Sequence, residues 1–171
     1  PYQTFTSVVD LVQQAAKDPA VLGIKMTLYR VGNNSPIVKA LMEARQRGKQ
    51  VTAVVELKAR FDEERNINWA EEMERQGVNV VYGFVGLKVH AKLCLVIRKE
   101  ASGIRSYVHI GTGNYNPGSA KNYTDLGLLT SAQDICSDVT DLFNVMTGYA
   151  VRDNYRRLFV SPTCMRSGIE R

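Results

Sequence analysis

The stretch VLGIKMTLYRVGNNSPIVKALMEARQRGKQVTAVVEL, residues 21–57, decides the fold class. It begins with a short apolar run, 21–29, that is typical of a strand, and it ends with a β-branched run, 51–57, typical of a buried strand. Between them, a Ser-Pro pair at 35–36 begins a helix with apolar residues at helical spacing, and Gly48 ends it. A strand, a helix and a second strand in this order predict a parallel pair with a right-handed crossover.

The same pattern continues on both sides of this unit. A helix is predicted over 5–17, and a third helix over 67–76 is followed by a strand over 78–84. Farther along, strands over 92–98 and 105–110 are joined by a polar loop, which predicts a hairpin. The remaining predicted elements are a strand over 125–130, a helix over 134–149 that continues past 151, and a basic tail. We therefore expect an α/β sandwich with a mixed sheet flanked by helices.

Length and composition bound the class of protein. A chain of 171 residues with 44% hydrophobic and 23% charged residues is ordinary for one globular domain, which excludes disordered, fibrous and disulfide-rich classes. No apolar run of membrane-spanning length is present. Cys94, Cys136 and Cys164 lack the spacing of a zinc site, so we expect reduced, structural thiols. The chain starts at Pro1 without a secretory leader, and we expect it to be part of a longer protein.

The net charge of +5 fits a polyanionic partner such as a nucleotide, a nucleic acid or a phosphate polymer, although simple solubility explains it equally well. The sequence has no GxxxxGK[ST] phosphate loop, no GxGxxG turn between a strand and a helix, and no GxSxG nucleophile turn. The residues that carry chemistry therefore have to be found outside these common motifs.

Histidine is scarce, with only His90 and His109. His90 precedes the strand predicted over 92–98, and alternation places it on one face with Lys88 and Lys92. Two ammonium groups beside an imidazole disfavour its cationic form, and a neutral ring is a nucleophile or a base. A surface histidine among solvated lysines is the alternative. His109 lies inside an apolar run and is expected in the core or half-buried.

The loop GTGNYNPG, residues 111–118, is rich in glycine. Glycine lets the backbone approach a ligand closely and present its amide groups to an anion. A plain polar turn is the alternative. Tyr115 and Tyr123 are candidate stacking platforms for a base, although tyrosine more often serves only in packing.

Two arginines follow predicted parallel strands, Arg30 after the first and Arg60 after the second. Ligands of open α/β sheets bind at this carboxyl edge, and the guanidinium fork matches phosphate oxygens. Ordinary surface arginines are the alternative. The same edge carries four carboxylates, Glu56, Asp62, Glu63 and Glu64. They could orient Arg60 or help to hold Mg²⁺, and a solvated run of charge is the simpler interpretation.

A family resemblance rests on two of these features. His90-Ala91-Lys92 at the start of a strand, followed by the turn Gly111-Thr112-Gly113-Asn114, resembles the phospholipase D superfamily. This resemblance implies a phospholipase-D-like α/β sandwich with a mixed sheet flanked by helices. The aspartate of that superfamily, five residues after the lysine, falls on Ile97 here, which argues against ordinary phosphodiesterase chemistry.

Four longer strings carry a more specific resemblance. TLYRVGNNSP (27–36), VELKARFDEERNI (55–67), YGFVGLKVHAKLCLV (82–96) and HIGTGNYNPGSAKNYTDLGLLT (109–130) resemble bacterial polyphosphate kinase, in its first phospholipase-D-like C-terminal domain. The resemblance covers about residues 2–162. It implies an ATP:polyphosphate phosphotransferase that moves the γ-phosphoryl group of ATP reversibly onto polyphosphate through a phosphohistidine, with Mg²⁺ as cofactor.

The resemblance assigns roles by position. His90 matches the histidine that becomes phosphorylated, and Lys92 belongs to the same catalytic motif. Arg30 and Arg60 match two arginines of the phosphate and Mg²⁺ site, and because arginine has no lone pair for a metal, both are expected on phosphate oxygens. The direct ligands of the Mg²⁺ near them stay open. The expected ATP-binding residues are Tyr123, which would stack on adenine, Asn114 and Asp125.

The resemblance also implies a larger assembly. Residues 1–162 would form one catalytic half-domain, and residues 163–171 the start of a linker or of the next domain. N-terminal domains and a second half-domain of the same chain would complete an enzyme that we expect to be a homo-oligomer, and the 171 residues alone would be nearly inactive. The partners would be ATP, ADP and polyphosphate rather than nucleic acid, and the location cytoplasmic, either free or peripheral at the membrane.

Two other functions stay open. A phosphodiesterase or phosphatidyl transferase of the phospholipase D type would need an acidic residue near Ile97 and would act without ATP or Mg²⁺. A non-catalytic polyanion-binding module would bind ATP or polyphosphate even without His90, and it would form no phosphoenzyme.

Overall fold

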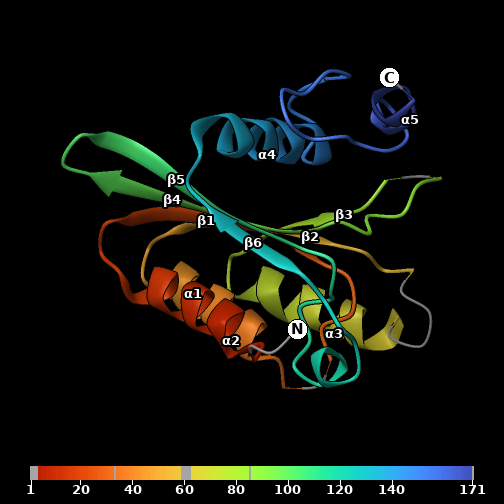
Figure 1. Cartoon of the computed structure of the whole chain (residues 1–171). Coiled ribbons are helices and arrows are strands. Elements are labelled where there is room, and N and C mark those ends of the chain that lie inside the picture. Colours follow the sequence, from red (N-terminus) through yellow and green to blue (C-terminus); the bar gives the residue numbers. More distant parts are fainter. Residues whose placement is uncertain (1–3, 33, 59–62, 85, 171) are drawn as a thin grey trace.

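The computed structural model of the chain describes residues 4–32, 34–58, 63–84 and 86–170. It is a six-stranded mixed sheet with helices on both faces (Figure 1), so the predicted α/β sandwich is confirmed. No helix in the described part of the chain is long and apolar enough to cross a membrane.

The N-terminal half alternates helices with parallel strands. Its elements are α1 (Thr6–Lys17), β1 (Val21–Leu28), α2 (Pro36–Gln46), β2 (Gln50–Val55), α3 (Glu63–Arg75) and β3 (Asn79–Tyr82). β1 pairs with β2 and β2 pairs with β3, both in parallel. Ser35 begins α2, because its Oγ accepts a hydrogen bond from the Val38 amide. Gly48 follows α2 with a φ of 83°, a conformation that favours glycine.

The second half of the sheet is antiparallel. Its elements are β4 (Lys92–Glu100), β5 (Gly103–Gly111), the 3-10 helix η1 (Ser119–Lys121), β6 (Gly127–Thr130), α4 (Gln133–Met146) and α5 (Met165–Ile169). β4 runs antiparallel to β1, β5 to β4 and β6 to β5. The complete strand order is β3-β2-β1-β4-β5-β6, which places β1 and β4 at the centre.

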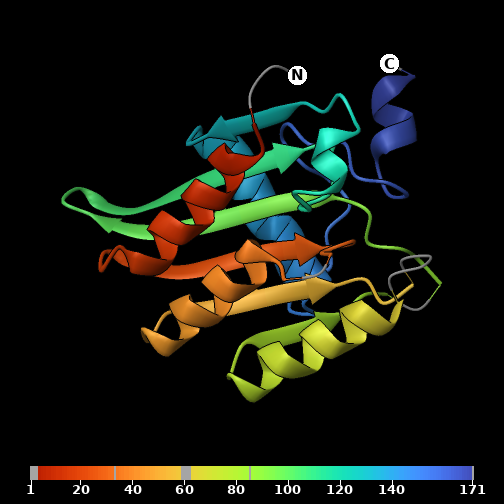
Figure 2. The same ribbon diagram turned by 90° about the horizontal axis from the view of Figure 1, so that it is seen from below.

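The sheet separates two apolar layers. Figure 1 shows α4 on one face, and Figure 2 shows α1, α2 and α3 side by side on the other. The buried cluster on the three-helix face includes Val12, Ile24 and Leu41, and the cluster under α4 includes Leu95 and Phe143. Because both faces are covered, the central strands read as nearly continuous apolar runs instead of alternating ones.

β6 is an edge strand, the last in the strand order, and apolar side chains on it and just before it are exposed to solvent. Leu128 and Leu129 are 48% and 61% exposed, and Leu126, just before the strand, is 68% exposed. No strand lies beyond β6 in the described part of the chain, so one row of its backbone groups has no strand partner there.

The helix predicted over 134–149 ends at Met146, and its predicted continuation past 151 is wrong. Residues 151–160 contain no helix, and they are tied to α4 by the fully buried Asp138. The Asp138 carboxylate accepts hydrogen bonds from the Arg157 and Leu158 amides at 2.6 and 3.1 Å, and from the Arg156 side chain at 3.2 Å.

The carboxyl ends of the parallel strands define one edge of the sheet, and one end of each of the six strands lies along it. The carboxyl ends of β1 and β2 meet there, and the reversal of direction brings the start of β4 beside them. The end of β5 and the start of β6 lie at the same edge, because Lys92 pairs with Gly111 and Gly111 pairs with Gly127. The tip of the β4–β5 hairpin lies at the opposite edge (Figure 2).

Candidate active site

Five of the predicted site residues lie at this edge of the sheet. Arg30 follows β1, His90 precedes β4, and Lys92 is the first residue of β4. Asn114 follows β5, and Asp125 precedes β6. The strand ends therefore bring together residues that are up to 95 positions apart in the sequence.

The His90 imidazole is accessible to solvent and packs edge-on against Tyr29, with 4.7 Å between the ring centroids. Its pKa is lowered from the ordinary value of 6.5, mainly because part of the ring is desolvated and also because Lys92, Arg30 and Lys88 carry positive charge. The ring is therefore neutral at pH 7 and offers a lone pair.

Lys92 is only 5% exposed, although lysine is rarely buried. Its Nζ donates a hydrogen bond to the His90 carbonyl oxygen at 2.5 Å and lies 3.0 Å from Nδ1 of the same residue. Burial is the main cause that lowers the pKa of Lys92 to about 8, while Asp125 opposes the shift and Arg30 adds to it. The side chain is therefore cationic at pH 7 and loses its charge as the pH passes about 8.

Tyr29 was not identified from the sequence, yet its ring is shared by the cations of the site. Arg30 Cζ lies 5.5 Å and Lys92 Nζ lies 5.3 Å from the centre of this ring. Both distances are within the range of cation–π attraction. The only available signal was its position next to Arg30, and strand alternation would have placed the two side chains on opposite faces.

Arg30 is close enough to act on both functional groups, because its charge lowers the pKa of His90 and that of Lys92. Arg60, the second predicted arginine, lies outside the described residues. The pairing of two guanidinium groups around one phosphate therefore stays a prediction.

The turn after β5 holds Asp125 at the site. Thr112 Oγ1 donates a hydrogen bond to Asp125 Oδ1 at 3.0 Å and accepts one from the Leu126 amide at 3.0 Å. Gly113 has no room for a side chain, because a Cβ there would lie 2.2 Å from Asp125 Oδ2. This glycine permits a close approach of a carboxylate to the backbone.

A cavity of about 630 Å³, lined by Asn114, Tyr123 and Asp125, lies between this turn and the N-terminal end of α1. Its volume is within the range of small-molecule sites. Asn114 Oδ1 is buried and has no hydrogen-bond partner among the described residues. Tyr123 is 67% exposed. The cavity is thus lined by an exposed aromatic side chain.

His109 is a core histidine, as its apolar neighbours predicted. It is 9% exposed, and its Nδ1 lies 3.0 Å from the Tyr115 hydroxyl. Burial lowers the pKa of His109 and raises the pKa of Tyr115. Because Tyr115 is only 3% exposed, the interpretation of this tyrosine as a stacking platform is wrong.

Glu56 is not part of a solvated run of charge. It is 4% exposed, its Oε2 accepts a hydrogen bond from the Val89 amide at 2.7 Å, and its Oε1 accepts one from the Lys58 amide at 2.8 Å. Both oxygens are thus used by the backbone next to the site. The other carboxylates are Glu63 and Glu64, which are exposed at the start of α3, and Asp62, which lies outside the described residues.

A metal site built by the protein alone does not fit these residues. In the part of the chain that the structure describes, no three His, Cys, Asp or Glu side chains gather in a way that could hold a metal ion. Asp125, which lies near Lys92, offers a carboxylate to a metal ion. Arg30 offers no ligand atom, because its guanidinium group has no lone pair to donate. Mg²⁺ commonly binds through one or two carboxylates together with the phosphates of a ligand, and in that case Asp125 would be a carboxylate that holds it.

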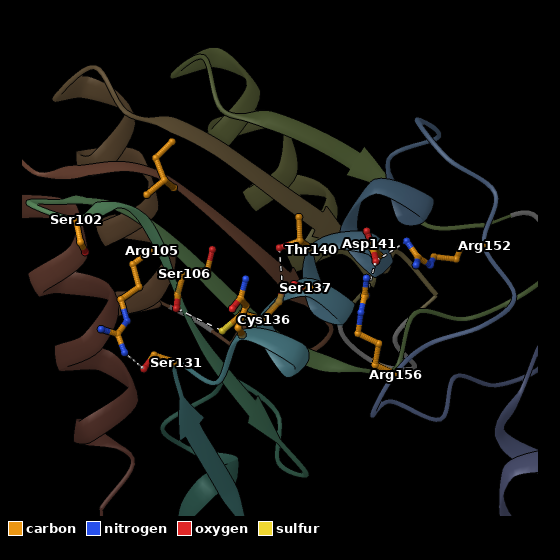
Figure 3. Close-up of a pocket in the computed structure, with 12 residues that line it drawn as sticks. Ser102, Arg105, Ser106, Ser131, Cys136, Ser137, Thr140, Asp141, Arg152 and Arg156 are labelled. Carbon is orange, nitrogen blue, oxygen red and sulfur yellow. Dashed lines mark hydrogen bonds and ion pairs between the residues drawn. The ribbon is translucent and has the colours of Figure 1, made fainter.

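A second cavity, of about 610 Å³, lies away from this edge, between the β4–β5 hairpin and α4. Figure 3 shows Arg105 bonded to Ser131, and both Arg152 and Arg156 paired with Asp141. Because these charged and polar groups bind one another, and neither histidine of the chain lines the cavity, we assign no substrate to it.

The strand order and the mixed sheet define an α/β domain with the fold of the phospholipase D family. A phospholipase D family member, Nuc from Salmonella typhimurium, superposes with a TM-score of 0.62 and covers 85% of this chain and 90% of its own. The sequence identity of that pair is 18%, so the likeness concerns the fold.

The chain belongs to the polyphosphate kinase C-terminal domain 1 family, which matches residues 1–152. The crystal structure of polyphosphate kinase from Porphyromonas gingivalis superposes on 99% of this chain and 28% of its own, with a TM-score of 0.86 and 42% identity. Polyphosphate kinases of Mycolicibacterium gilvum and a Synechocystis species are 58% and 60% identical over 99% and 97% of this chain. The chain spans 23% of the length of each of these two relatives.

Proposed function

We propose that this domain is the catalytic half-domain of a polyphosphate kinase and transfers the γ-phosphoryl group of ATP reversibly to polyphosphate. Beside the family, one observation carries the proposal: an accessible imidazole with a lowered pKa lies next to Lys92 and Arg30. Phosphoryl transfer needs a lone pair aimed at phosphorus and cations for the oxygens around it, and this arrangement supplies both.

The reaction proceeds through a phosphohistidine at His90. A ring nitrogen attacks the γ-phosphorus, a nitrogen–phosphorus bond forms, and the bond from phosphorus to the β–γ bridging oxygen breaks, so that ADP leaves with that electron pair. A terminal oxygen of polyphosphate then attacks the same phosphorus and releases the neutral imidazole. When ADP is the acceptor, the sequence runs backward.

The cations act on the oxygens of the transferred group. Lys92 and Arg30 donate to the equatorial oxygens, and Arg60, which lies outside the described residues, is proposed to supply a second guanidinium. Mg²⁺ bound to the triphosphate would neutralise part of its charge. Burial leaves the ammonium group of Lys92 weakly solvated, which lowers its pKa to about 8. A weakly solvated ammonium group bonds strongly to phosphate.

The nucleoside part of ATP occupies the cavity beside Asn114 and Asp125. Tyr123 stacks on the adenine, since an exposed aromatic ring binds any base through its face. Asn114, which lines the same cavity, is a further proposed contact of the nucleotide.

Ile97 separates this proposal from phosphodiesterase chemistry. The side chain is half-buried on β4 and packs against the apolar cluster under α4. A phosphodiesterase of the phospholipase D type would carry a carboxylate at this position. The apolar residue here therefore favours a kinase.

The complete enzyme includes more than this domain. We propose that residues 1–162 form one half-site, that a second half-domain of the same polypeptide supplies a further histidine, and that the assembled enzyme is a cytoplasmic homo-oligomer. The 171 residues alone would then turn over little or no ATP.

Labelling tests this function in the longer polypeptide that carries the domain. After incubation with ATP that is radioactive at the γ position, we expect acid-labile label on His90 and none on His109. His90→Gln, which keeps a polar side chain of similar size, should abolish the label while the midpoint of thermal unfolding stays unchanged. Label retained in His90→Gln, or label found on His109, contradicts the proposal.

A further inference from the structure

We propose that Thr27 and Glu56 are positioning residues that fix the backbone on the two sides of His90. This inference rests on the proposed function, in which His90 is the nucleophile. Neither residue is among the proposed catalytic or nucleotide-binding residues, and both are almost completely buried, at 2% and 4% exposure.

Thr27 holds the chain after His90. Regular pairing between β1 and β4 ends at Met26 and Cys94. Beyond that pair, the Thr27 hydroxyl donates a hydrogen bond to the Ala91 carbonyl oxygen at 2.7 Å and accepts one from the Leu93 amide at 2.9 Å. A single hydroxyl thus satisfies two backbone groups at the point where β4 begins.

Glu56 holds the chain before His90. Its Oε2 accepts a hydrogen bond from the Val89 amide at 2.7 Å, and its Oε1 accepts one from the Lys58 amide at 2.8 Å. Hydrogen bonds to a carboxylate are stronger than those between neutral groups. Gly83 leaves the space for this carboxylate, since a Cβ there would lie 3.3 Å from Oε2.

Asn66 connects the backbone after Thr27 with the backbone of Glu56. It is completely buried on α3, and its Nδ2 donates hydrogen bonds to the Glu56 and Tyr29 carbonyl oxygens at 2.9 and 2.5 Å. The ends of β1 and β2 are therefore linked to one another as well as to the segment that carries His90.

The direction of the imidazole follows from these contacts. Val89 and Ala91 are the immediate neighbours of His90. Each has a backbone group held by a buried side chain, from Glu56 just after β2 and from Thr27 on β1. In-line attack on phosphorus requires the ring nitrogen to be placed closely, and a displacement of about 1 Å reduces the rate roughly a hundredfold.

The test compares variants of the longer polypeptide. Thr27→Val has the same shape without the hydroxyl, Thr27→Ser keeps the hydroxyl, and Glu56→Gln keeps the shape without the charge. Thr52→Val is the matched control, because Thr52 lies on β2 and its hydroxyl bonds only Asn79 among the described residues. The measurements are kcat, KM for ATP, the rate of label transfer to His90, and thermal unfolding.

Thr27→Val and Glu56→Gln should lower kcat and the labelling rate roughly tenfold to hundredfold while KM for ATP stays unchanged, because they displace the nucleophile and not the nucleotide. Thr27→Ser should restore most of the rate, and Thr52→Val should match the wild type. If Thr27→Val does not fold, Glu56→Gln and Thr27→Ser carry the comparison.

The outcomes separate this inference from the proposed function. A wild-type enzyme that takes no label on His90 overturns both. Label on the wild type together with wild-type kcat in Thr27→Val or Glu56→Gln overturns the positioning role alone. So does a loss of kcat that parallels a loss of thermal stability and is not restored by serine at position 27.

Discussion

The Nζ atom of Lys92 lies 3.0 Å from Nδ1 and 3.1 Å from Nε2 of His90, so the ammonium group lies against the imidazole and not end-on to one nitrogen. A protonated ring would carry an N–H at both positions and would place two cations in contact. The pair therefore has one charge state at neutral pH, a cationic lysine and a neutral histidine. We expect the oxygens of the bound triphosphate to draw the ammonium group away from the ring before attack.

The pH dependence of the rate should reflect this pair. Histidine attacks only when neutral, so activity rises with pH through the lowered pKa of His90, below 6.5. Lys92 acts only as a cation, so activity falls as the pH passes about 8. The measurement is kcat/KM from pH 5 to pH 10. In Lys92→Arg, whose guanidinium stays charged, the alkaline fall should disappear. A wild-type profile that stays flat up to pH 10 contradicts the role of Lys92.

The burial of Lys92 should destabilise the fold at neutral pH. Its pKa is about 8 in the folded chain and 10.5 when exposed, so the unfolded state binds more protons between these values and stability rises with pH there. Lys92→Met should therefore raise the midpoint of thermal unfolding of the 171-residue chain at pH 7, and the gain should disappear above about pH 10.5. Lys88→Met, at an exposed lysine, is the control and should show no such dependence. Equal midpoints for Lys92→Met and wild type at pH 7 would count against the assigned burial cost.

Tyr123 should determine the affinity for ATP. Loss of a stacking ring removes about 1–3 kcal/mol, so Tyr123→Ala should weaken ATP binding roughly tenfold to hundredfold. Tyr123→Phe keeps the ring and should bind as the wild type does. Tyr149→Ala removes a tyrosine that is 83% exposed and does not line the cavity, and it should have no effect. Calorimetric titration with ATP measures all three, and wild-type affinity in Tyr123→Ala contradicts the stacking role.

Asp138 should stabilise the C-terminal segment through its charge. Burial alone would raise the pKa of this carboxyl group, but hydrogen bonds from the amides of residues 156–158 outweigh it and lower the pKa below 3.8. Asp138→Asn should reduce the free energy of unfolding by about 1–3 kcal/mol, because the NH2 group of the asparagine side chain would face a backbone N–H donor. The stabilisation should be present above pH 4 and be lost as the pH falls through the lowered pKa.

Chemical denaturation at pH 7 and pH 3 tests this prediction. Asp134→Asn is the matched control, because its ion pair with Arg157 is exposed and contributes little to stability. A difference between Asp138→Asn and wild type that persists unchanged at pH 3 argues against a charge effect.

Local signals were sufficient to predict most of the fold. The helix from Pro36 to Gln46 has a serine cap at its start and a glycine after its end, and both lie within a few residues of the helix. The segment after Met146 was predicted wrongly for the opposite reason. It is held by Asp138, and no local pattern indicates that a carboxylate on a helix accepts hydrogen bonds from the amides of Arg157 and Leu158.

The sequence predicted which residues of the candidate site follow or precede strands, but not how deeply they are buried. Arg30 was expected after one strand and His90 before another, and the structure has both at the same edge of the sheet. The environments of Lys92 and Glu56 depend on neighbours from other strands, so their charges looked solvated in the sequence. For Tyr115 the sequence left stacking and packing open, since a tyrosine that stacks on a ligand and one that packs on His109 have the same local sequence, and the structure shows packing.

The exposed leucines beside the unpaired border of β6 have a practical consequence for work on the separate domain. An apolar edge strand that has no neighbouring strand, as is the case for β6 within the described residues, can pair with another such strand, so we expect concentrated solutions of the 171 residues to self-associate through this border. Each preparation should therefore be checked by light scattering before activity is measured, because an aggregated sample would show no activity even if its histidine is reactive.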